Sequence, residues 1–263
     1  MIKDKLYIIP KLEEIDKYMK LVEEYNLHFE YNDFFIPDVI DDNELVEEII
    51  AEYHNISNLP ENNTLHGAFL DVAIFSSDNK IRAISEYRIR QSIDVASKIG
   101  AKAMVMHTNY IPNFQDDNYE NCWVERNAKF IKKLLRDYPD INVYMENMFD
   151  MTPDLLLRLA EKLKNYDNFG ICLDYAHASV FGNGKLKASE WMEKLAPYIK
   201  HIHINDNDLI KDRHLPLGQG SIDYVEFAKL YEKYCNEATV LIEVSGIDKV
   251  RESLDYLKEK EII

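Results

Sequence analysis

Short apolar segments alternate with amphipathic segments along the chain. The short segments are rich in β-branched and large apolar residues, as in strands buried within a sheet. The amphipathic segments repeat their apolar positions at a helical period. The clearest of them are residues 11–25, 43–55, 82–100, 127–138 and 248–260. The predicted strands are residues 5–9, 27–31, 64–69, 103–107, 142–146, 170–174, 201–205 and 239–244.

Strands that alternate with helices in this way predict an α/β fold. Eight such units in 263 residues favour one (β/α)8 TIM barrel over residues 1–263, with its site at the C-terminal mouth of the strands. A doubly wound open sheet is the alternative. Its nucleotide-binding form is disfavoured, because the sequence has neither GxGxxG after the first strand nor GxxxxGK[ST]. No linker composition marks a second domain.

Local signals place the starts of two helices. Thr152 has the character of an N-cap with Pro153 in the first turn, and Ser221 is the expected N-cap of a helix that includes residues 221–227.

The composition is that of a soluble globular protein, with 46% hydrophobic and 30% charged residues. The apolar runs are too short to span a bilayer, and the first residues carry charges where a signal peptide needs an apolar stretch. We therefore expect a cytoplasmic protein without a membrane partner. The three cysteines are far apart and lack CxxC spacing, which fits a reducing compartment and predicts no cysteine zinc site.

The formal net charge of −16 disfavours nucleic acid as a partner, because such a surface repels phosphates. The most basic stretch, residues 131–136, has the spacing of a solvated helix face. Nucleic acid is not excluded, since bound metal ions can reverse the local potential.

Side chains that bind metals gather at the C-terminal ends of the predicted strands. Such ends converge on the mouth of a TIM barrel. One of these residues alone is more often a satisfied polar side chain, but a buried set is costly unless it binds something. Histidines and carboxylates together suit zinc, manganese, cobalt or iron. The residues are His66, His107, Glu146, Asp174, His177, His203 and Glu243.

The segment after the seventh predicted strand adds further candidates. His201 points the same way as His203 but one layer deeper, and we expect it to be a buried supporting residue. Asp212 and His214 are two residues apart, so an extended loop would turn both to one face. Arg213 between them could bind an anionic group of a substrate. The alternative is a solvated polar loop that leads into a helix.

These stretches resemble the xylose isomerase-like TIM-barrel superfamily over about residues 64–246. The superfamily joins sugar and sugar-phosphate isomerases and epimerases with apurinic-site endonucleases of the endonuclease IV type (AP endonuclease family 2). The combination of "LDYAHA" with "DRHLPLGQG" is specific for the superfamily but not for one activity. The stretches that carry the resemblance are "AMVMH", "VYMEN", "GICLDYAHA", "HIHINDND", "DRHLPLGQGSIDY" and "LIEV".

The resemblance implies two alternative sites with one to three divalent ions, zinc, manganese or cobalt. In the isomerase branch one ion is held by residues matching Glu146, Asp174, His203 and Glu243, and the two glutamates are the catalytic acid/base pair. In the endonuclease branch three zinc ions are bound. The first would be bound by His66, His107 and a bridging Glu146, the second by Glu146, Asp174, His203 and Glu243, and the third by His177, Asp212 and His214.

Departures from the endonuclease pattern favour the isomerase branch. The N-terminal segment lacks the Gly- and Ser-rich opening of the endonucleases, and "HGAF" resembles isomerase-like members. The aromatics of residues 31–37 lie among acidic residues, which suits a lid over a sugar better than a wedge in DNA. The preferred function is thus a metal-dependent isomerase or epimerase of a sugar or sugar phosphate. A multi-zinc phosphoester hydrolase, which would be an apurinic-site endonuclease or a small phosphodiesterase, is the alternative. A barrel that binds without catalysis is a third hypothesis.

Overall fold

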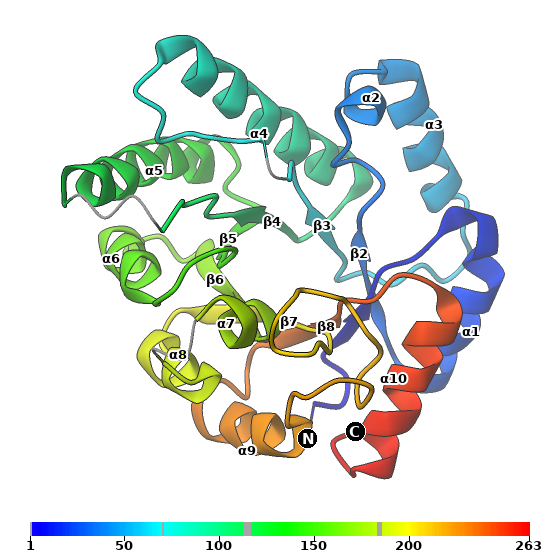
Figure 1. Ribbon diagram of the computed structural model, residues 1–263. Coiled ribbons are helices and arrows are strands. Elements are labelled where there is room, and N and C mark those ends of the chain that lie inside the picture. Colours follow the sequence, from blue (N-terminus) through cyan, green and yellow to red (C-terminus); the bar gives the residue numbers. More distant parts are fainter. Residues whose placement is uncertain (1, 70, 113–116, 183–185) are drawn as a thin grey trace.

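The strands close into one parallel barrel (Figure 1). The computed structural model describes residues 2–69, 71–112, 117–182 and 186–263. Neighbours follow the chain order, and the last strand pairs with the first through Leu6 and Val240. The strands are β1 (Leu6–Ile8), β2 (His28–Tyr31), β3 (Thr64–His66), β4 (Ala103–His107), β5 (Asn142–Glu146), β6 (Phe169–Asp174), β7 (Ile199–Ile204) and β8 (Thr239–Ile242).

Helices surround this barrel on the outside (Figure 1). The prediction of an α/β (β/α)8 barrel is therefore confirmed, and the open doubly wound sheet is wrong because β8 returns to β1. The helices are η1 (Leu12–Glu14), α1 (Ile15–Tyr25), α2 (Pro37–Ile40), α3 (Asn43–His54), α4 (Asn79–Ile99), α5 (Asp117–Asp137), α6 (Asp154–Leu163), α7 (Tyr175–Phe181), α8 (Ala188–Leu195), α9 (Tyr224–Tyr234) and α10 (Ile247–Glu259).

The core lies both inside the barrel and between the barrel and its helices. All residues of β4 and of β6 are buried, because parallel strands are covered on both faces. Each helix contributes one apolar stripe, as in α6, where Leu156, Leu159 and Leu163 are fully buried at spacings of three and four. These layers place the strand ends in a rigid frame.

Both predicted helix starts are corrected. The N-cap of α9 is Asp223, whose carboxylate accepts hydrogen bonds from the backbone N–H groups of Val225 and Glu226. The N-cap position of α6 belongs to Pro153, and the Thr152 hydroxyl donates to Asp154 instead of accepting from the backbone. An aspartate two residues beyond a serine offers the same kind of acceptor, so local sequence cannot choose between them.

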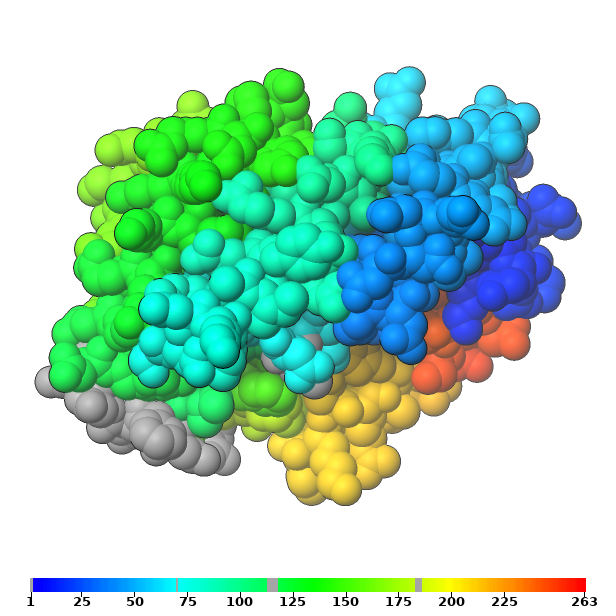
Figure 2. Space-filling model, turned by 90° about the horizontal axis from the view of Figure 1, so that it is seen from above, coloured from blue at the N-terminus to red at the C-terminus, as the bar shows by residue number. Residues whose placement is uncertain are grey.

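The chain leaves β3 and β8 earlier than predicted. β3 ends at His66 and not at residue 69, and β8 ends at Ile242, so Glu243 lies just past the strand. The segment after β7 forms a lobe on the outside of the molecule, coloured yellow in Figure 2. Within the described residues no helix is long and apolar enough to cross a membrane.

Candidate metal centre

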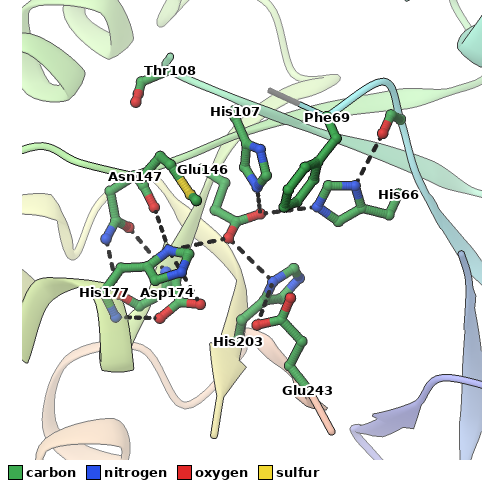
Figure 3. A network of polar contacts seen from close by, with 12 residues as sticks. His66, Phe69, His107, Thr108, Glu146, Asn147, Asp174, His177, His203 and Glu243 are labelled. Atoms are coloured by element: carbon green, nitrogen blue, oxygen red, sulfur yellow. Dashed lines mark hydrogen bonds and ion pairs between the residues drawn. The ribbon is translucent and has the colours of Figure 1, made fainter. Parts of the chain in front are cut away.

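Glu146, the last residue of β5, lies at the centre of a cluster of histidines (Figure 3). Its side chain is fully buried. His66 and His107 from the ends of β3 and β4 point their Nε2 atoms at Oε2 of Glu146, at 3.5 and 3.4 Å. His203 of β7 faces the other oxygen, Oε1, through Nδ1 at 3.4 Å. One carboxylate is thus shared by histidines from three strands.

Asp174 and Glu243 complete a second group with Glu146 and His203. Asp174 ends β6 and is also the N-cap of α7, where its Oδ1 accepts from the His177 N–H at 2.6 Å and leaves Oδ2 for the centre. The Asn147 side chain holds the backbone N–H and carbonyl of Asp174 with two bonds of 2.9 Å. Oε2 of Glu243 lies 3.7 Å from His203 Nδ1.

His177, Asp212 and His214 form a third group at the edge of the mouth. Asp212 Oδ2 is 3.3 Å from His177 Nε2 and 2.9 Å from His214 Nε2. The expectation that Asp212 and His214 share one face is correct, but its basis in an extended loop is not. The chain is not extended at His214, whose φ of 45° is left-handed, and its ring contacts both Asp212 and the Glu243 carbonyl.

The loop that carries Asp212 and His214 is tied down by one buried carboxylate, Asp206. Its Oδ1 accepts from the Ile222 N–H at 3.1 Å and its Oδ2 from the Gly218 N–H at 2.9 Å. A Cβ on Gly220 would lie 2.3 Å from Asp206 Oδ1 and 2.4 Å from the Asn207 carbonyl oxygen, so this position requires glycine. The "LPLGQG" stretch thus closes the loop around Asp206.

Three of the histidines are oriented by backbone carbonyls. The Nδ1 of His66 contacts the Gly67 oxygen at 3.0 Å, that of His177 the Asn147 oxygen at 2.9 Å, and that of His214 the Glu243 oxygen at 2.9 Å. A carbonyl only accepts, so Nδ1 carries a proton in each ring, and Nε2 is the nitrogen that can give its own proton up to bind a cation. A second partner of this kind is typical of histidines that bind metals.

The residues fit a set of divalent ions. Within the described residues, both oxygens of Glu146, Oδ2 of Asp174, Nε2 of His66 and Nδ1 of His203 are buried without a hydrogen-bond partner. The contacts around Glu146 measure 3.4 to 3.7 Å. Two ligands on a tetrahedral zinc, each at about 2.0–2.1 Å, are roughly 3.4 Å apart. The donor atoms therefore face one another at the spacing that shared cations would bridge.

Burial and mutual contact shift the pKa values of these groups in opposite directions. Burial opposes ionisation of Glu146, but His203 and His107 outweigh it and hold the pKa of this carboxyl well below its usual range. Burial, with Glu243 and Glu146 nearby, raises the pKa of Asp174 well above its usual range. Burial lowers the pKa of His177, but Asp174 and Asp212 outweigh it and raise the pKa to about 10. Cations that bind here must therefore displace protons.

A pocket of about 240 Å³ opens directly onto these groups. Its walls include the aromatic rings of Phe35 and Phe69, whose centroids are 5.7 Å apart. Lys249 on α10 adds a cationic side chain at the wall. This volume is below the roughly 300–1,000 Å³ usual for drug-sized ligands, so it suits a small reacting group.

The sequence pattern of the xylose isomerase-like TIM barrel family matches residues 20–260. The chain belongs to this family. The resemblance seen in the strand-end motifs is therefore confirmed, and it extends over more of the chain than those motifs do.

One of two relatives of this xylose isomerase-like barrel carries a functional name. An uncharacterized protein of Methanocaldococcus jannaschii is 30% identical, over 74% of this chain and 76% of the relative. A probable endonuclease 4 of Mycobacterium leprae is 29% identical over 60% of this chain, and the match spans 64% of the endonuclease, less than two thirds of its length.

Two solved structures share the fold of this xylose isomerase-like barrel. A D-tagatose 3-epimerase-like protein is 24% identical, with a TM-score of 0.75 over 98% of this chain and 97% of that chain. A protein of Thermus thermophilus soaked with ZnCl2 is 22% identical, with a TM-score of 0.77 over 97% of each chain.

Two residues of this xylose isomerase-like centre were not predicted from the sequence. Glu30 of β2 is fully buried, and its two oxygens lie 3.3 Å from Nε2 of His203 and of His201. The signal was a lone acidic residue within the apolar segment "LHFEY". Cys172 of β6 lies beside Glu146 and His203, and burial raises the pKa of its thiol well above the usual range. His201 is buried, as predicted.

Arg213 lies apart from the other predicted site residues. Its Nε contacts Asp208 Oδ2 at 2.6 Å, and half of its side chain is exposed. Among the described residues that line the pocket, Asp212 and His214 are present and Arg213 is not. The predicted contact of Arg213 with an anionic substrate would need this side chain to leave Asp208.

Proposed function

We propose that this protein is a metal-dependent phosphoester hydrolase that holds three divalent ions, with zinc the first candidate. One observation carries the proposal. Nine ligand side chains lie in three groups: His66, His107 and Glu146; Glu146, Asp174, His203 and Glu243; and His177, Asp212 and His214. A centre with one ion would leave the first and third groups without a purpose and would bury their polar atoms at a cost.

Charge separates the two candidate chemistries. The nine ligands include four carboxylates, Glu146, Asp174, Asp212 and Glu243. With neutral histidines, three divalent ions bring the set to a net charge of +2. One ion in the second group leaves the set neutral, because His177 and His214, whose pKa values are raised to about 10, then keep their protons. An anionic phosphoester is therefore attracted more strongly to the first arrangement than to the second. The full set of ligands therefore favours a phosphoester as the substrate.

The side chains have distinct parts in this proposal. The three groups would hold the ions, which when bound supply Lewis acidity and lower the pKa of water for attack on phosphorus. Glu146, shared by the first two groups, keeps them at a fixed separation. The Phe35 and Phe69 rings restrict water at the pocket wall, and Lys249 attracts an anionic substrate.

The second candidate is the isomerase or epimerase favoured by the sequence. The group of Glu146, Asp174, His203 and Glu243 is complete by itself as a site for one ion. The D-tagatose 3-epimerase-like structure has the same fold. In this alternative Glu146 and Glu243 would remove and return a proton next to a bound carbonyl.

Metal content and substrate class together test the proposal. Protein purified without chelator or affinity-tag metal is analysed for its elements, then assayed with bis(p-nitrophenyl) phosphate, a duplex that carries one abasic site, and ketoses in D2O. We expect about three zinc equivalents and phosphoester cleavage. One equivalent with deuterium uptake into a ketose would contradict the proposal and support the epimerase.

The two phosphoester probes distinguish a small phosphodiester from abasic DNA as the substrate. The M. leprae relative is named as an endonuclease, which favours abasic DNA, whereas the net charge of −16 favours a small phosphodiester. Cleavage of the duplex should fall steeply with added salt if DNA is the substrate, because phosphate contacts release counterions.

A further inference from the structure

Glu30 joins two histidines of β7 inside the barrel, below the metal centre. It is fully buried, as are His201 and His203. Its Oε1 is 3.3 Å from His203 Nε2, and its Oε2 is 3.3 Å from His201 Nε2. Thr64 of β3 donates its hydroxyl hydrogen to Oε2 at 2.7 Å. This carboxylate is therefore held by Thr64 and faces both imidazole rings at ion-pair distance.

The contacts continue in a line through the barrel. His201 Nδ1 contacts the Thr239 hydroxyl at 2.6 Å, and the rings of Tyr7 and Tyr144 flank His201 at centroid distances of 5.3 and 6.2 Å. At the other end, His203 Nδ1 faces Glu146 at 3.4 Å and Glu243 at 3.7 Å. Glu30 itself is absent from the described residues that line the pocket.

The position of Glu30 decides which nitrogen of His203 is free. His66, His177 and His214 each have a backbone carbonyl on Nδ1. Glu30 instead faces His203 on Nε2, at an ion-pair distance of 3.3 Å. A carboxylate on that side favours a proton on Nε2, so that Nδ1 is the nitrogen that faces a cation between Glu146 and Glu243. A carboxylate behind a ligand histidine also makes the ring a stronger donor to a cation.

We propose that Glu30 is a positioning residue of the centre: it sets the tautomer and ring orientation of His203 and adds a buried negative charge that strengthens cation binding. This inference rests on the proposed metal centre but not on its reaction. The competing role is that of a ligand, in which Glu30, His201 and His203 hold a fourth ion, because their donor atoms also lie close together. Thr64 already donates to Oε2 of Glu30, and none of Glu30, His201 and His203 is among the described residues that line the pocket, which favours the positioning role.

Zinc affinity and the state of the His203 ring test this role without any substrate. The full chain is stripped of metal, and zinc dissociation constants are measured by chelator competition for wild type and Glu30→Gln. We expect the variant to keep its circular dichroism and to bind one zinc roughly 10–100-fold more weakly. Asp33→Asn is the matched control, because Asp33 is a nearby acid that contacts Tyr53 and should leave all affinities unchanged.

A second measurement needs no variant and decides the matter if Glu30→Gln fails to fold. The ¹⁵N shifts of the ring nitrogens in zinc-loaded wild type should show His203 with its proton on Nε2. A proton on Nδ1, wild-type zinc affinity in Glu30→Gln, or a fourth zinc equivalent in wild type would each overturn the positioning role. If wild type does not cleave phosphoesters but Glu30→Gln still weakens zinc binding, the proposed function is wrong and the positioning role of Glu30 is still supported.

Discussion

At the scale of single residues, neighbours in the sequence have opposite roles. Asp212 and His214 face each other and His177 at the pocket, whereas Arg213 between them points to Asp208 at the surface. Removal of a side chain that binds an ion would leave that ion with too few ligands. An exposed ion pair, in contrast, contributes only about 0–1 kcal/mol to stability. The two kinds of residue should therefore respond very differently to truncation.

Asp212→Ala should remove one ion from the centre. We expect zinc content to fall from about three equivalents to two, and phosphoester hydrolysis to fall by about 10²–10³-fold, as when one electrostatic group of an active site is lost. Arg213→Ala is the control, with unchanged zinc content and a change in rate below about fivefold. Equal zinc content in both variants would rule out the third group as an ion site.

Asp150→Asn should change how stability depends on pH. Asp150 is buried beside Thr108, and burial raises its carboxyl pKa from 3.8 to about 6. Between these values the folded chain binds more protons than the unfolded chain, so this group makes stability fall as the pH rises through that window.

Urea unfolding of metal-free protein at pH 4, 5, 6 and 7 measures this effect. Between pH 4 and pH 7, the free energy of unfolding should fall by roughly 1–3 kcal/mol more in wild type than in Asp150→Asn. Parallel pH profiles for the two proteins would show that Asp150 does not hold a proton in the folded chain at pH 5.

At the scale of elements, the caps of two helices also serve the mouth or its loops. Asp174 caps α7 with one oxygen and faces the centre with the other. Asp223 caps α9 at the end of the loop that bears Asp212 and His214. The same residues that begin these helices therefore also help to place the candidate ligands.

The cap of α9 is testable by a pair of substitutions. Asp223→Ala should destabilise the fold by about 1 kcal/mol, because it leaves the Val225 and Glu226 N–H groups without their acceptor. Ser221→Ala should change stability by less than about 0.5 kcal/mol, since Ser221 is exposed and not the cap. Chemical unfolding of both variants distinguishes the two positions, and a larger loss in Ser221→Ala would reverse the assignment.

At the scale of the whole molecule, acidic side chains are concentrated in the buried mouth of the barrel, where a negative charge is costly unless a cation binds beside it. Four acidic side chains, Glu30, Glu146, Asp174 and Glu243, are buried around one strand-end cluster in a chain of net charge −16. Histidines from three strands, one helix and one loop offset part of this charge. Bound cations would offset the rest, so ion binding and folding stability should be linked.

Removal of ions should lower the melting temperature. Each site filled at 100 times its dissociation constant stabilises the folded chain by about 2.7 kcal/mol. Chelation should therefore reduce Tm by roughly 5–10 °C per site, and added zinc should restore it. Calorimetry with and without chelator measures the shift, and a Tm that ignores both chelator and zinc would contradict a cation-stabilised core.

Much of the fold was predictable because its signals are local. The apolar strands and amphipathic helices repeat with clear periods, and the segments 103–107 and 142–146 match β4 and β5 residue for residue. Five ligand candidates could be predicted because each is a polar residue at or near the end of an apolar segment: His66, His107, Glu146, Asp174 and His203. The ends of β3 and β8 were less certain, since departure of the chain from a sheet depends on its neighbours.

Consecutive residues alone specify which ligand side chains sit at the strand ends, because alternation along a strand and the direction of a parallel sheet are local properties. Their grouping depends instead on tertiary contacts. Closure of the barrel brings Glu30 of β2 against His203 of β7, and the left-handed turn at His214 admits Asp212 while Arg213 stays outside. Glu30 and His203 are far apart in the chain, and the opposite directions of Asp212 and Arg213 depend on backbone angles. The periodicity of apolar and polar residues reports neither.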